Sequence, residues 1–553
     1  MRARVGWMAA VLFLGGRAWA ADYYVAPTGN DANAGTEAAP FATVQKGNDV
    51  AKAGDTVWLR GGTFQIGKQL KLNKSGPSDA MRIRFFAYQG EHPVLDFATY
   101  ETTNRAADVE AVAITGSWLH LKGLEVKNVP MDGDGSHSNS GVRSRNASNN
   151  TFELLDIHHV SGPGLFIDGG QGGNLILNCD SHDNYDKNGS QGDGQNGDGF
   201  GVHYQTSGPS TIIRGSRAWY NSDDGYDFIS QEVPVVNENS WAMYNGLAEG
   251  GAVKPSSGNG NGFKAGSSKT GIRHVLRGCV AWKNTAAGFY ANHSSGGNTW
   301  YNNTAWSNGA AFNMLASPPD EPNTTITLTG DKAHIMRNNI GFPNKNTNMM
   351  GVDTKSNSWD LTLTPTNDDF VSVSDMGCMG PRPASGGMPV TEFLHLKQGS
   401  KLIDKGEDVK LTFVGSAPDL GAYEYGAPAP GTGGIAAGGT SGAGGVSLGG
   451  GAGAEAGGTS SGAGTTPTGG TPGSAGAASG GSSVEPTAGT APAGAGTASS
   501  TAGAGAGGSS GAAPSPGEED AGCSCRLGAS KSSAPVWLAL ALGWLAIRRR
   551  RAA

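Results

Sequence analysis

Charged residues are scarce in this sequence, and neither sign dominates. Only 16% of the 553 residues are Asp, Glu, Lys or Arg, and 40 basic residues stand against 47 acidic ones, which gives a net charge of −7 at pH 7. A protein that binds the phosphate backbone needs a surplus of Lys and Arg. The composition therefore argues against a nucleic-acid partner.

Cysteine is also rare, with five residues at irregular positions: Cys179, Cys279, Cys378, Cys523 and Cys525. An odd and irregular set does not build the disulfide framework of a small secreted domain. We interpret Cys179 and Cys279 as small buried hydrophobic residues. The Cys523 and Cys525 pair offers too few ligands for a closed zinc site.

Between Ala427 and Asp520 the sequence has no Lys, Arg, His or aromatic residue at all. Gly, Ala, Ser and Thr fill this stretch, and such a composition cannot bury enough apolar surface to form a core. We therefore predict a disordered linker over residues 427–522. The preceding residues 21–426 are enough for one large folded domain.

The first twenty residues have the pattern of a secretory signal peptide. Arg2 and Arg4 supply the positive charge, Val5–Phe13 is mostly apolar, and the Ala-Trp-Ala sequence at residues 18–20 fits a cleavage site. A buried N-terminal helix is the alternative. We predict that residues 1–20 are a signal peptide and that the protein is exported.

Residues 523–553 read as a second targeting signal. The two cysteines precede a short apolar run, Ala534–Ile547, which ends in the four arginines Arg548–Arg551. The run is short for a stable membrane span, and the arginines would stay cytoplasmic. The order of elements resembles the myxobacterial C-terminal sorting tag, which implies processing by sorting machinery and attachment to, or release from, the cell surface. An ordinary transmembrane tail anchor is the alternative, and it also places the protein at the envelope.

The middle of the chain repeats itself. Five similar short motifs end in Asn184, Asn221, Asn245, Asn284 and Asn308, at spacings of 37, 24, 39 and 24 residues. A second phrase, Gly followed by an aromatic residue, recurs at Phe200, Tyr226, Phe263 and Phe289, at spacings of 26, 37 and 26. The unit is therefore about 24 residues, with longer Gly- and Asn-rich insertions in some turns.

A unit of this length, made of short β phrases separated by Gly and Asn, is typical of one coil of a parallel β-helix. A sandwich would show hairpin signals without a fixed period, and a leucine-rich repeat would show a Leu ladder. We predict an all-β parallel β-helix with Asn and aromatic residues stacked inside it. The segment 41–53, which has partly helical spacing, would cap its N-terminal end.

When the coils are aligned by their aromatic residue, the candidate functional side chains lie on one face. Because side chains alternate along a strand, the residues after each buried aromatic point outward, and adjacent coils lie about 4.8 Å apart. Asp198 and Asp224 stack just before the strand, with Asp223 beside them. The outward set on this groove is His203, Asp227, Lys264, Tyr290 and Asn292.

Four carboxylates thus converge: Asp198, Asp223, Asp224 and Asp227. They would repel one another unless neutralised, and an oxygen-rich anionic site suits Ca²⁺ better than zinc. The alternative is that each aspartate caps its own turn. The alignment of four with a lysine in the next row favours a metal, although the ligand spacing is not that of an EF-hand.

Lys264 has two interpretations. It could form a salt bridge to Asp227, or it could act as a general base, since a lysine beside a divalent cation loses its proton more readily. Such a base suits the removal of the proton at C5 of a uronate, followed by loss of the oxygen at C4. A glycosidase would instead need two carboxylates that flank the bond.

The motifs around these residues resemble those of family nine polysaccharide lyases, the pectate lyase group. The resemblance lies in residues 221–227 (Asn-Ser-Asp-Asp-Gly-Tyr-Asp), 196–200 (Asn-Gly-Asp-Gly-Phe) and 259–266 (Asn-Gly-Asn-Gly-Phe-Lys-Ala-Gly), and the ends of residues 22–426 also match. It implies a right-handed parallel β-helix, β-elimination on an acidic polysaccharide with pectate favoured, and Lys264 as base. It implies Ca²⁺ on Asp198, Asp223, Asp224 and Asp227.

Two other functions remain open from the sequence. A non-catalytic surface β-helix that binds glycans would keep the repeats without needing Lys264 beside the carboxylates. A glycoside hydrolase on the same fold would release products without a new double bond. His203, Tyr290 and Asn292 could contact sugar or be plain surface residues, and we expect the protein to be a monomer.

Overall fold

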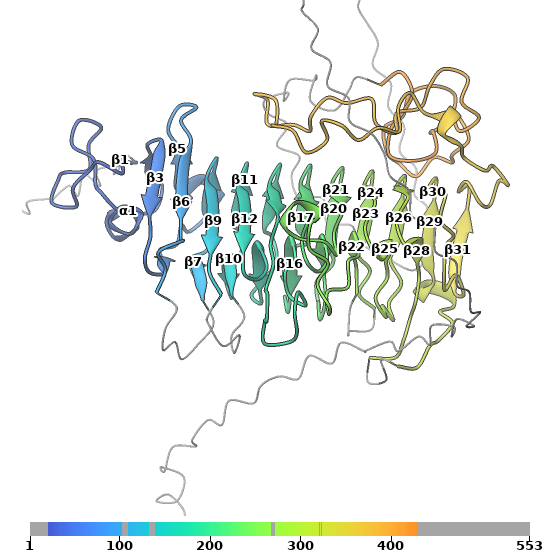
Figure 1. Cartoon of the computed structure of the whole chain (residues 1–553), viewed down its shortest axis with the longest axis horizontal. Helices are drawn as coiled ribbons and strands as arrows, with labels where there is room; N and C mark the ends of the chain where they lie inside the picture. The colour runs from blue at the N-terminus through green and yellow to red at the C-terminus, as the bar shows by residue number, and fades with distance from the viewer. Residues whose placement is uncertain are drawn as a thin grey trace, which may run out of the picture. The chain divides into compact units, whose positions relative to one another are not determined.

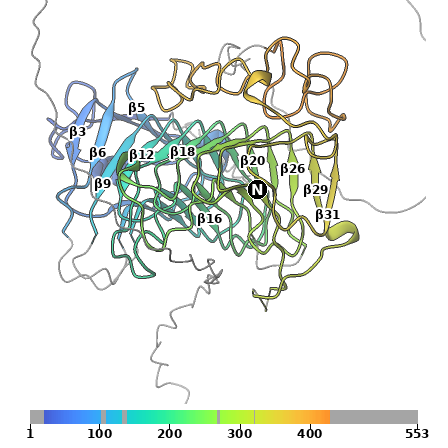
Figure 2. The ribbon, with the colours of Figure 1, turned by 45° about the vertical axis from the view of Figure 1, so that its right-hand side comes forward.

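The computed structural model describes residues 20–101, 109–131, 139–266, 271–319, 321 and 323–427. Within them the chain winds into successive coils that stack along one long axis, as Figures 1 and 2 show. Nearly all of the predicted signal peptide and of the predicted linker lies outside these residues, as does the C-terminal segment with its apolar run. Inside them, no helix has the length and apolar character needed to cross a membrane.

Each full coil contributes one strand to each of three sheets, and every pairing between named strands is parallel. The twelve-stranded sheet consists, in spatial order, of β1 (Asp22–Val25), β2 (Thr56–Leu59), β5 (Ile83–Ala87), β8 (Leu119–Lys122), β11 (Thr151–Glu153), β14 (Leu175–Leu177), β17 (Thr211–Arg214), β20 (Val235–Glu238), β23 (Val275–Arg277), β26 (Thr299–Tyr301), β29 (His334–Arg337) and β31 (Val352–Lys355). The ten-stranded sheet consists of β3 (Gly62–Gln65), β6 (Pro93–Asp96), β9 (Glu125–Val129), β12 (Asp156–Val160), β15 (Asp180–His182), β18 (Arg217–Trp219), β21 (Trp241–Met243), β24 (Val280–Trp282), β27 (Thr304–Trp306) and β30 (Ile340–Phe342).

The nine-stranded sheet carries the predicted site. It consists of β4 (Leu70–Leu72), β7 (Glu110–Ile114), β10 (Ser140–Arg145), β13 (Leu165–Asp168), β16 (Phe200–His203), β19 (Tyr226–Asp227), β22 (Phe263–Lys264), β25 (Ala287–Tyr290) and β28 (Ala310–Asn313). The described helices are short: α1 (Val44–Val50) and the 3₁₀ turns η1 (Asp79–Met81), η2 (Glu249–Gly251), η3 (Gly330–Lys332) and η4 (Asn367–Asp369). The predicted parallel β-helix is confirmed.

Aromatic rings stack through the interior of the nine-stranded sheet. Phe200, Tyr226, Phe263 and Phe289 are fully buried, and successive ring centroids lie 5.1, 4.7 and 5.0 Å apart in near-parallel planes. The stack continues to Phe312 at 4.8 Å. These distances match the spacing of the coils, so the sequence repeat that predicted an internal stack is confirmed.

A second ladder runs through the turn between the ten-stranded and nine-stranded sheets. The side-chain amide of each asparagine donates to the amide oxygen of the next, from Asn184 to Asn221 (2.8 Å), to Asn245 (3.0 Å), to Asn284 (2.9 Å) and to Asn308 (2.8 Å). Buried amides need such partners, because an unpaired one costs free energy. This is the structural reason for the repeated Asn.

Helix α1 covers the N-terminal end of the core, as predicted. Thr43 caps it by accepting a hydrogen bond from the backbone N–H of Lys46 at 3.2 Å. Val44 and the preceding Phe41 are buried in the same core as the strands. The cap shields apolar side chains that the first coil would otherwise expose to water.

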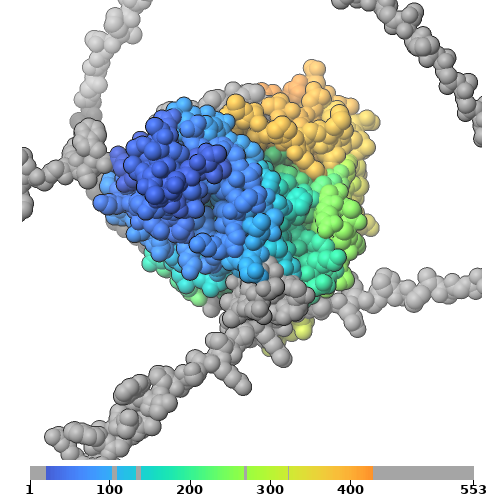
Figure 3. Space-filling view, turned by 60° about the vertical axis from the view of Figure 1, so that its left-hand side comes forward, coloured from blue at the N-terminus to red at the C-terminus, as the bar shows by residue number. Residues whose placement is uncertain are grey.

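The ten-stranded sheet is covered by a C-terminal segment, residues 366–427, which the sequence analysis did not predict. Phe370, Phe393 and Leu402 pack against Trp241 and Trp282 in a second hydrophobic cluster. Figure 3 shows this orange segment against one flank of the coils. The buried Arg217 joins the two parts, because it pairs with Asp180 (2.6 Å) and donates to the carbonyls of Cys378 and Gly380.

The two cysteines interpreted as buried hydrophobic residues are indeed fully buried and free. Each occupies a ladder position between the twelve-stranded and ten-stranded sheets. The backbone N–H of Cys179 donates to the Ser216 hydroxyl, and that of Cys279 donates to the side-chain oxygen of Asn303. Burial raises the pKa of both thiols to about 12, so neither is a reactive thiolate.

Candidate active site

The outward face of the nine-stranded sheet places the predicted residues in one row. Gly201, Asp227, Lys264 and Tyr290 are register partners on four successive strands, β16, β19, β22 and β25. Their neighbours in sequence are the stacked interior rings, so alternation along each strand directs this row outward. The alignment made from the sequence is therefore confirmed at these positions.

The position before each Gly-aromatic pair forms its own ladder. Oδ1 of Asp198 accepts from the backbone N–H of Asp224 at 3.1 Å, and Oδ1 of Asp224 accepts from the backbone N–H of Asn261 at 2.7 Å. Oδ1 of Asn261 accepts in turn from the N–H of Ala287 at 3.1 Å. Each aspartate thus caps the next coil with one oxygen.

We call Asp198, Asp223, Asp224 and Asp227 the aspartate cluster. The first three each place a carboxylate oxygen within 4.8 Å of the others, and none of the four is more than 5% exposed. Asp227 lies outside that tight group of three, and its Oδ2 atom is 3.4 Å from Lys264 Nζ. Oδ1 of Asp227 is buried without accepting a hydrogen bond, whereas Oδ2 of Asp224 faces the Lys264 ammonium.

Burial and mutual repulsion govern ionisation in the cluster. Burial raises the pKa of Asp198 and Asp223 well above the usual value, and the neighbouring carboxylates raise it further. Burial also raises the pKa of Asp224, although Lys264 opposes the shift. Burial would raise the pKa of Asp227 as well, but Lys264 and His203 hold it below the usual value. Additional positive charge would therefore stabilise the ionised cluster.

Lys264 is buried beside these carboxylates, with only 3% of its surface exposed. Its Nζ atom lies 3.0 Å from Oδ2 of Asp224 and 3.4 Å from Oδ2 of Asp227. The Asp224 contact is the shorter of the two. The predicted salt bridge to Asp227 is present, and an ammonium buried this deeply needs such partners.

Of the three residues predicted to contact sugar, His203 and Tyr290 lie on the face of the site and Asn292 does not. His203 lies at the site, with Nε2 3.5 Å from Oδ2 of Asp227 and its ring edge-on to Phe166. Tyr290 is the register partner of Lys264 and is half-buried on the same face. Asn292 follows the end of β25 in a left-handed conformation and packs against Gly266, so it does not belong to the outward row of the strand.

Sequence reasoning missed two asparagines that shape the site. The backbone N–H of Asn259 donates to Oδ1 of Asp223 at 2.6 Å, and its side-chain oxygen lies 3.5 Å from Lys264 Nζ. Asn261 donates to Asp224 through both its backbone and its side chain. Asn261 was detectable, because it occupies the repeat position of Asp198 and Asp224. Asn259 lies in an irregular insertion and carries no periodic signal.

The residues present fit a divalent cation that prefers oxygen ligands. The cluster offers several carboxylate oxygens in a small volume, and one of them, Oδ1 of Asp227, is buried without a hydrogen bond. Hard cations such as Ca²⁺ bind sites of this kind, whereas zinc favours nitrogen and sulfur ligands. The tight group consists of Asp198, Asp223 and Asp224, and no described cysteine or histidine belongs to it.

Comparison with known proteins agrees with this geometry. A family model described as the Pel9A-like, right-handed β-helix region matches residues 23–339. The chain belongs to this family. The right-handed sense of the coils follows from that membership, as the sequence analysis predicted.

Several enzymes are similar to this chain along most of their length. Pectate lyase L of Dickeya dadantii is 34% identical over 414 residues, which are 73% of this chain and 90% of that protein. Pectate lyase PEL9 of Emericella nidulans is 30% identical over 72% of this chain and 97% of that protein. The crystal structure of pectate lyase Pel9A matches with a TM-score of 0.63 at 33% identity, covering 73% of this chain and 96% of that one. With these relatives, the chain is a polysaccharide lyase.

Proposed function

We propose that this Pel9A-like protein is a Ca²⁺-dependent lyase that cleaves pectate, or a closely related uronate polymer, by β-elimination. The observation that carries the proposal is the contact between a buried lysine, Lys264, and a cluster of buried carboxylates on the outward side of the nine-stranded sheet. The similar proteins named pectate lyase support the choice of substrate.

Asp198, Asp223, Asp224 and Asp227 would hold the cation. When bound, Ca²⁺ supplies positive charge against the negative charge that develops on the substrate carboxylate. The backbone N–H groups of Asn259 and Asn261 orient the carboxylates of Asp223 and Asp224 before substrate arrives. Because these donors are fixed by the coils, the site needs little reorganisation during the reaction.

Lys264 is the proposed base. It accepts the proton from C5 of the uronate, the electron pair of that C–H bond forms the C4–C5 double bond, and the C4–O bond breaks. The departing oxygen takes a proton from solvent. Lys264 must be neutral to accept a proton, and its present partners, Asp224 and Asp227, favour the charged form. Neutralising those carboxylates would therefore assist the release of its proton.

The deciding experiment is an ultraviolet assay for the new double bond on polygalacturonate, with and without a chelator. We expect absorbance to rise only when Ca²⁺ is present and to recover when Ca²⁺ is restored after chelation. Full activity in excess chelator would refute the calcium requirement. Cleavage that raises reducing ends without absorbance would identify a hydrolase instead.

We also propose that the enzyme is exported and sorted to the cell surface. The support is the signal-peptide pattern of residues 1–20 and the resemblance of residues 523–553 to a sorting tag. Mass spectrometry of the extracellular protein should find Ala21 at the N-terminus and processing near Cys523. An intact N-terminus in the exported protein would contradict the proposed cleavage site.

A further inference from the structure

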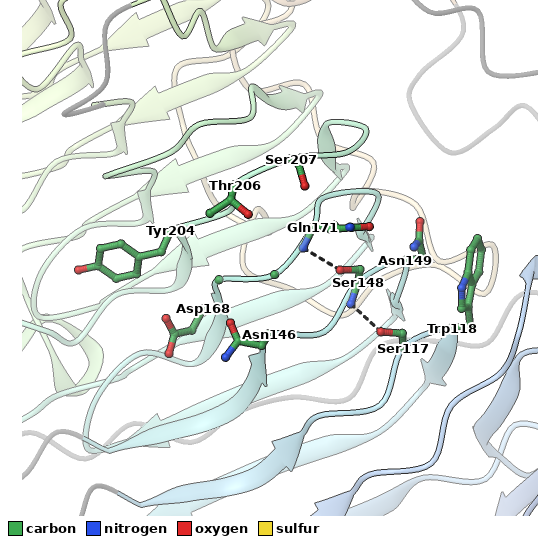
Figure 4. A pocket seen from close by; sticks show the side chains of 12 residues that line it. Ser117, Trp118, Asn146, Ser148, Asn149, Asp168, Gln171, Tyr204, Thr206 and Ser207 are labelled. Carbon is green, nitrogen blue, oxygen red and sulfur yellow. Dashed lines mark hydrogen bonds between the residues drawn. The ribbon is translucent and has the colours of Figure 1, made fainter. Parts of the chain in front are cut away.

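A pocket of about 610 Å³ lies at the turns that join the nine-stranded sheet to the twelve-stranded sheet. Figure 4 shows its lining, which comes from four successive coils and includes Trp118, Ser148, Gln171 and Thr206. We call it the turn pocket. Tyr204 at its edge follows His203 directly, and the two rings meet edge to face at 5.7 Å. The turn pocket is therefore adjacent to the proposed active site.

The lining has the chemistry of a sugar-binding surface. Trp118 and Tyr204 lie at opposite ends of the pocket, as Figure 4 shows, and Tyr204 is 39% exposed. Arg82 covers one face of the Trp118 ring at 5.1 Å. Between the rings lie hydroxyl and amide groups, and the side chains of Asn146 and Gln171 make no hydrogen bond to a described residue. Aromatic faces suit the C–H surfaces of sugars, and amides suit their hydroxyls.

The shape of the turn pocket is fixed by contacts between coils. The hydroxyl of Ser117 accepts a hydrogen bond from the backbone N–H of Ser148 at 3.0 Å. The hydroxyl of Ser148 accepts one from the backbone N–H of Gln171 at 2.8 Å. Gly170 has a φ of 80°, and a Cβ atom there would lie 2.9 Å from the backbone of Asn146. Only glycine fits this position. The pocket is thus formed before any ligand binds, which lowers the entropic cost of binding.

The charge of the lining selects between classes of sugar. Asp168 is the charged residue among those lining the turn pocket, and its carboxylate is paired with Arg143 at 2.7 Å. The described residues that line the pocket include no Lys, Arg or His. The neighbouring cations are already paired, because Arg143 and Arg145 both contact Asp168 and Arg145 also contacts Glu110 at 2.6 Å. A uronate bound here would find no unpaired cation among the described residues of the lining to neutralise its carboxylate, which is unfavourable. An uncharged sugar meets no such penalty.

We propose that the turn pocket binds uncharged sugar residues of the polysaccharide, beside the uronate at which cleavage occurs. The inference rests on the proposed function, since it assigns these sugars to the same polymer. Four coils are separated by three spacings, roughly 14 Å in all. That length accommodates a short oligosaccharide, so the ligand is a neutral branch or a neutral stretch of the chain.

Calorimetric titration of the full chain in chelator tests the proposal, because chelation removes any contribution of bound Ca²⁺. The probes are a neutral β-1,4-linked galactotetraose and tetragalacturonate of the same length. We expect the neutral probe to bind more tightly. Trp118→Ala and Tyr204→Ala should each weaken its binding about fivefold to tenfold, as for a typical aromatic anchor. Tyr204→Phe, which keeps the ring, should retain most of the affinity.

Two controls keep the result specific. Tyr425 is 38% exposed, which is similar to the 39% of Tyr204, but it does not line the pocket. Tyr425→Ala should therefore not change binding. Lys264→Ala should also leave binding intact, which separates this test from failure of the lyase proposal. Tighter binding of tetragalacturonate, or equal loss in the Tyr425 and Tyr204 variants, would overturn the proposal. So would the absence of any binding by the neutral probe to a folded protein.

Discussion

At the scale of single residues, Lys264 is the central residue of the proposed active site. It is buried, it contacts two carboxylates, and it stands on a strand whose register fixes its direction. A lysine on a flexible loop could reach the same carboxylates, but it would not hold one position relative to a bound sugar. The neighbouring His203 also lies at this site, with its Nε2 atom 3.5 Å from Oδ2 of Asp227.

We expect Lys264→Ala and Lys264→Arg both to lose most elimination activity, by about 10²- to 10⁴-fold, because neither side chain can act as a general base. Ordinary lysines are almost wholly charged at pH 7, so activity of the unchanged enzyme should rise with pH above neutrality. The ultraviolet assay measures both effects. Lys122→Arg, at an exposed lysine of another sheet, is the matched control. Near-normal turnover by Lys264→Arg would transfer the role of base to His203.

Asp227 allows a test of the metal site. Asp227→Asn keeps the shape of the side chain but removes the charge that faces Lys264 and His203. We expect the Ca²⁺ concentration for half-maximal activity to rise on the order of 10- to 100-fold, as for other groups around metal sites. Titrating Ca²⁺ into the ultraviolet assay gives this value. Asp79→Asn, at a carboxylate 82% exposed, should leave the Ca²⁺ requirement unchanged.

At the scale of elements, ladders between coils hold the strands in register. Asn245 occupies the centre of the asparagine ladder, donates to Asn284 at 2.9 Å and accepts from Asn221 at 3.0 Å. Each coil of a solenoid contacts only its neighbours, so stability is close to a sum of local terms. Breaking one step of the ladder therefore weakens two neighbouring contacts.

Asn245→Ala should lower the free energy of unfolding by about 1–3 kcal/mol, because it leaves buried amide groups unpaired. Thermal or denaturant unfolding followed by circular dichroism measures the change. Asn367→Ala is the control, since Asn367 is exposed and outside the ladder. If the two variants unfold alike, the ladder contributes nothing to stability.

The ten-stranded sheet carries a pH-dependent contact on its outer face. Burial by itself would lower the pKa of His182, but hydrogen bonds to Asp156 and Asp183 raise it to about 9. A raised folded-state pKa stabilises the fold fully below the unfolded value of about 6.5. That contribution is lost as the pH rises through about 9.

We therefore expect His182→Gln to destabilise the protein most at pH 6, on the order of 2–3 kcal/mol, and progressively less toward pH 9 and above. Denaturant unfolding of both proteins across this pH range measures the difference. His92→Gln is the control, because the side chain of His92 is 66% exposed. A difference that stays constant with pH would show that packing of the ring against Trp219, and not its charge, is what matters.

At the scale of the whole molecule, the C-terminal segment completes the enzyme by covering one of its three sheets. The rings of Trp219, Trp241 and Trp282 point out of the coils and would meet water without Phe370 and Phe393. An apolar patch of this kind is rarely left exposed on a soluble monomer. The segment is thus part of the folded domain and not a linker.

Two truncations test this boundary. A chain ending at Gly426 should fold and keep its activity, because residues 427–553 contain almost nothing from which to build a core. A chain ending at Pro365 should aggregate or unfold at a lower temperature, because it exposes the tryptophan face. Solubility, circular dichroism and the ultraviolet assay compare the two. Loss of folding in the longer truncation product would show that the boundary at Gly426 is wrong.

Much of this protein follows from the sequence by itself, because its structure is periodic. A repeat of about 24 residues places each aromatic ring and each asparagine one coil above the last, and alternation along the strand then directs Asp227 and Lys264 outward. The sequence prediction included Asn292, which lies two residues beyond the end of β25 at Tyr290. Periodicity predicts residues within a strand better than those at its ends.

Only the tertiary structure decided what lies between distant, non-repeating segments. Asn259 reaches Asp223 from an insertion, and Arg217 binds carbonyls of Cys378 and Gly380, more than 160 residues away. The turn pocket likewise arises from single residues of four separate coils. Such contacts depend on how irregular loops close over the coils, and loop closure leaves no period in the sequence from which it could be predicted.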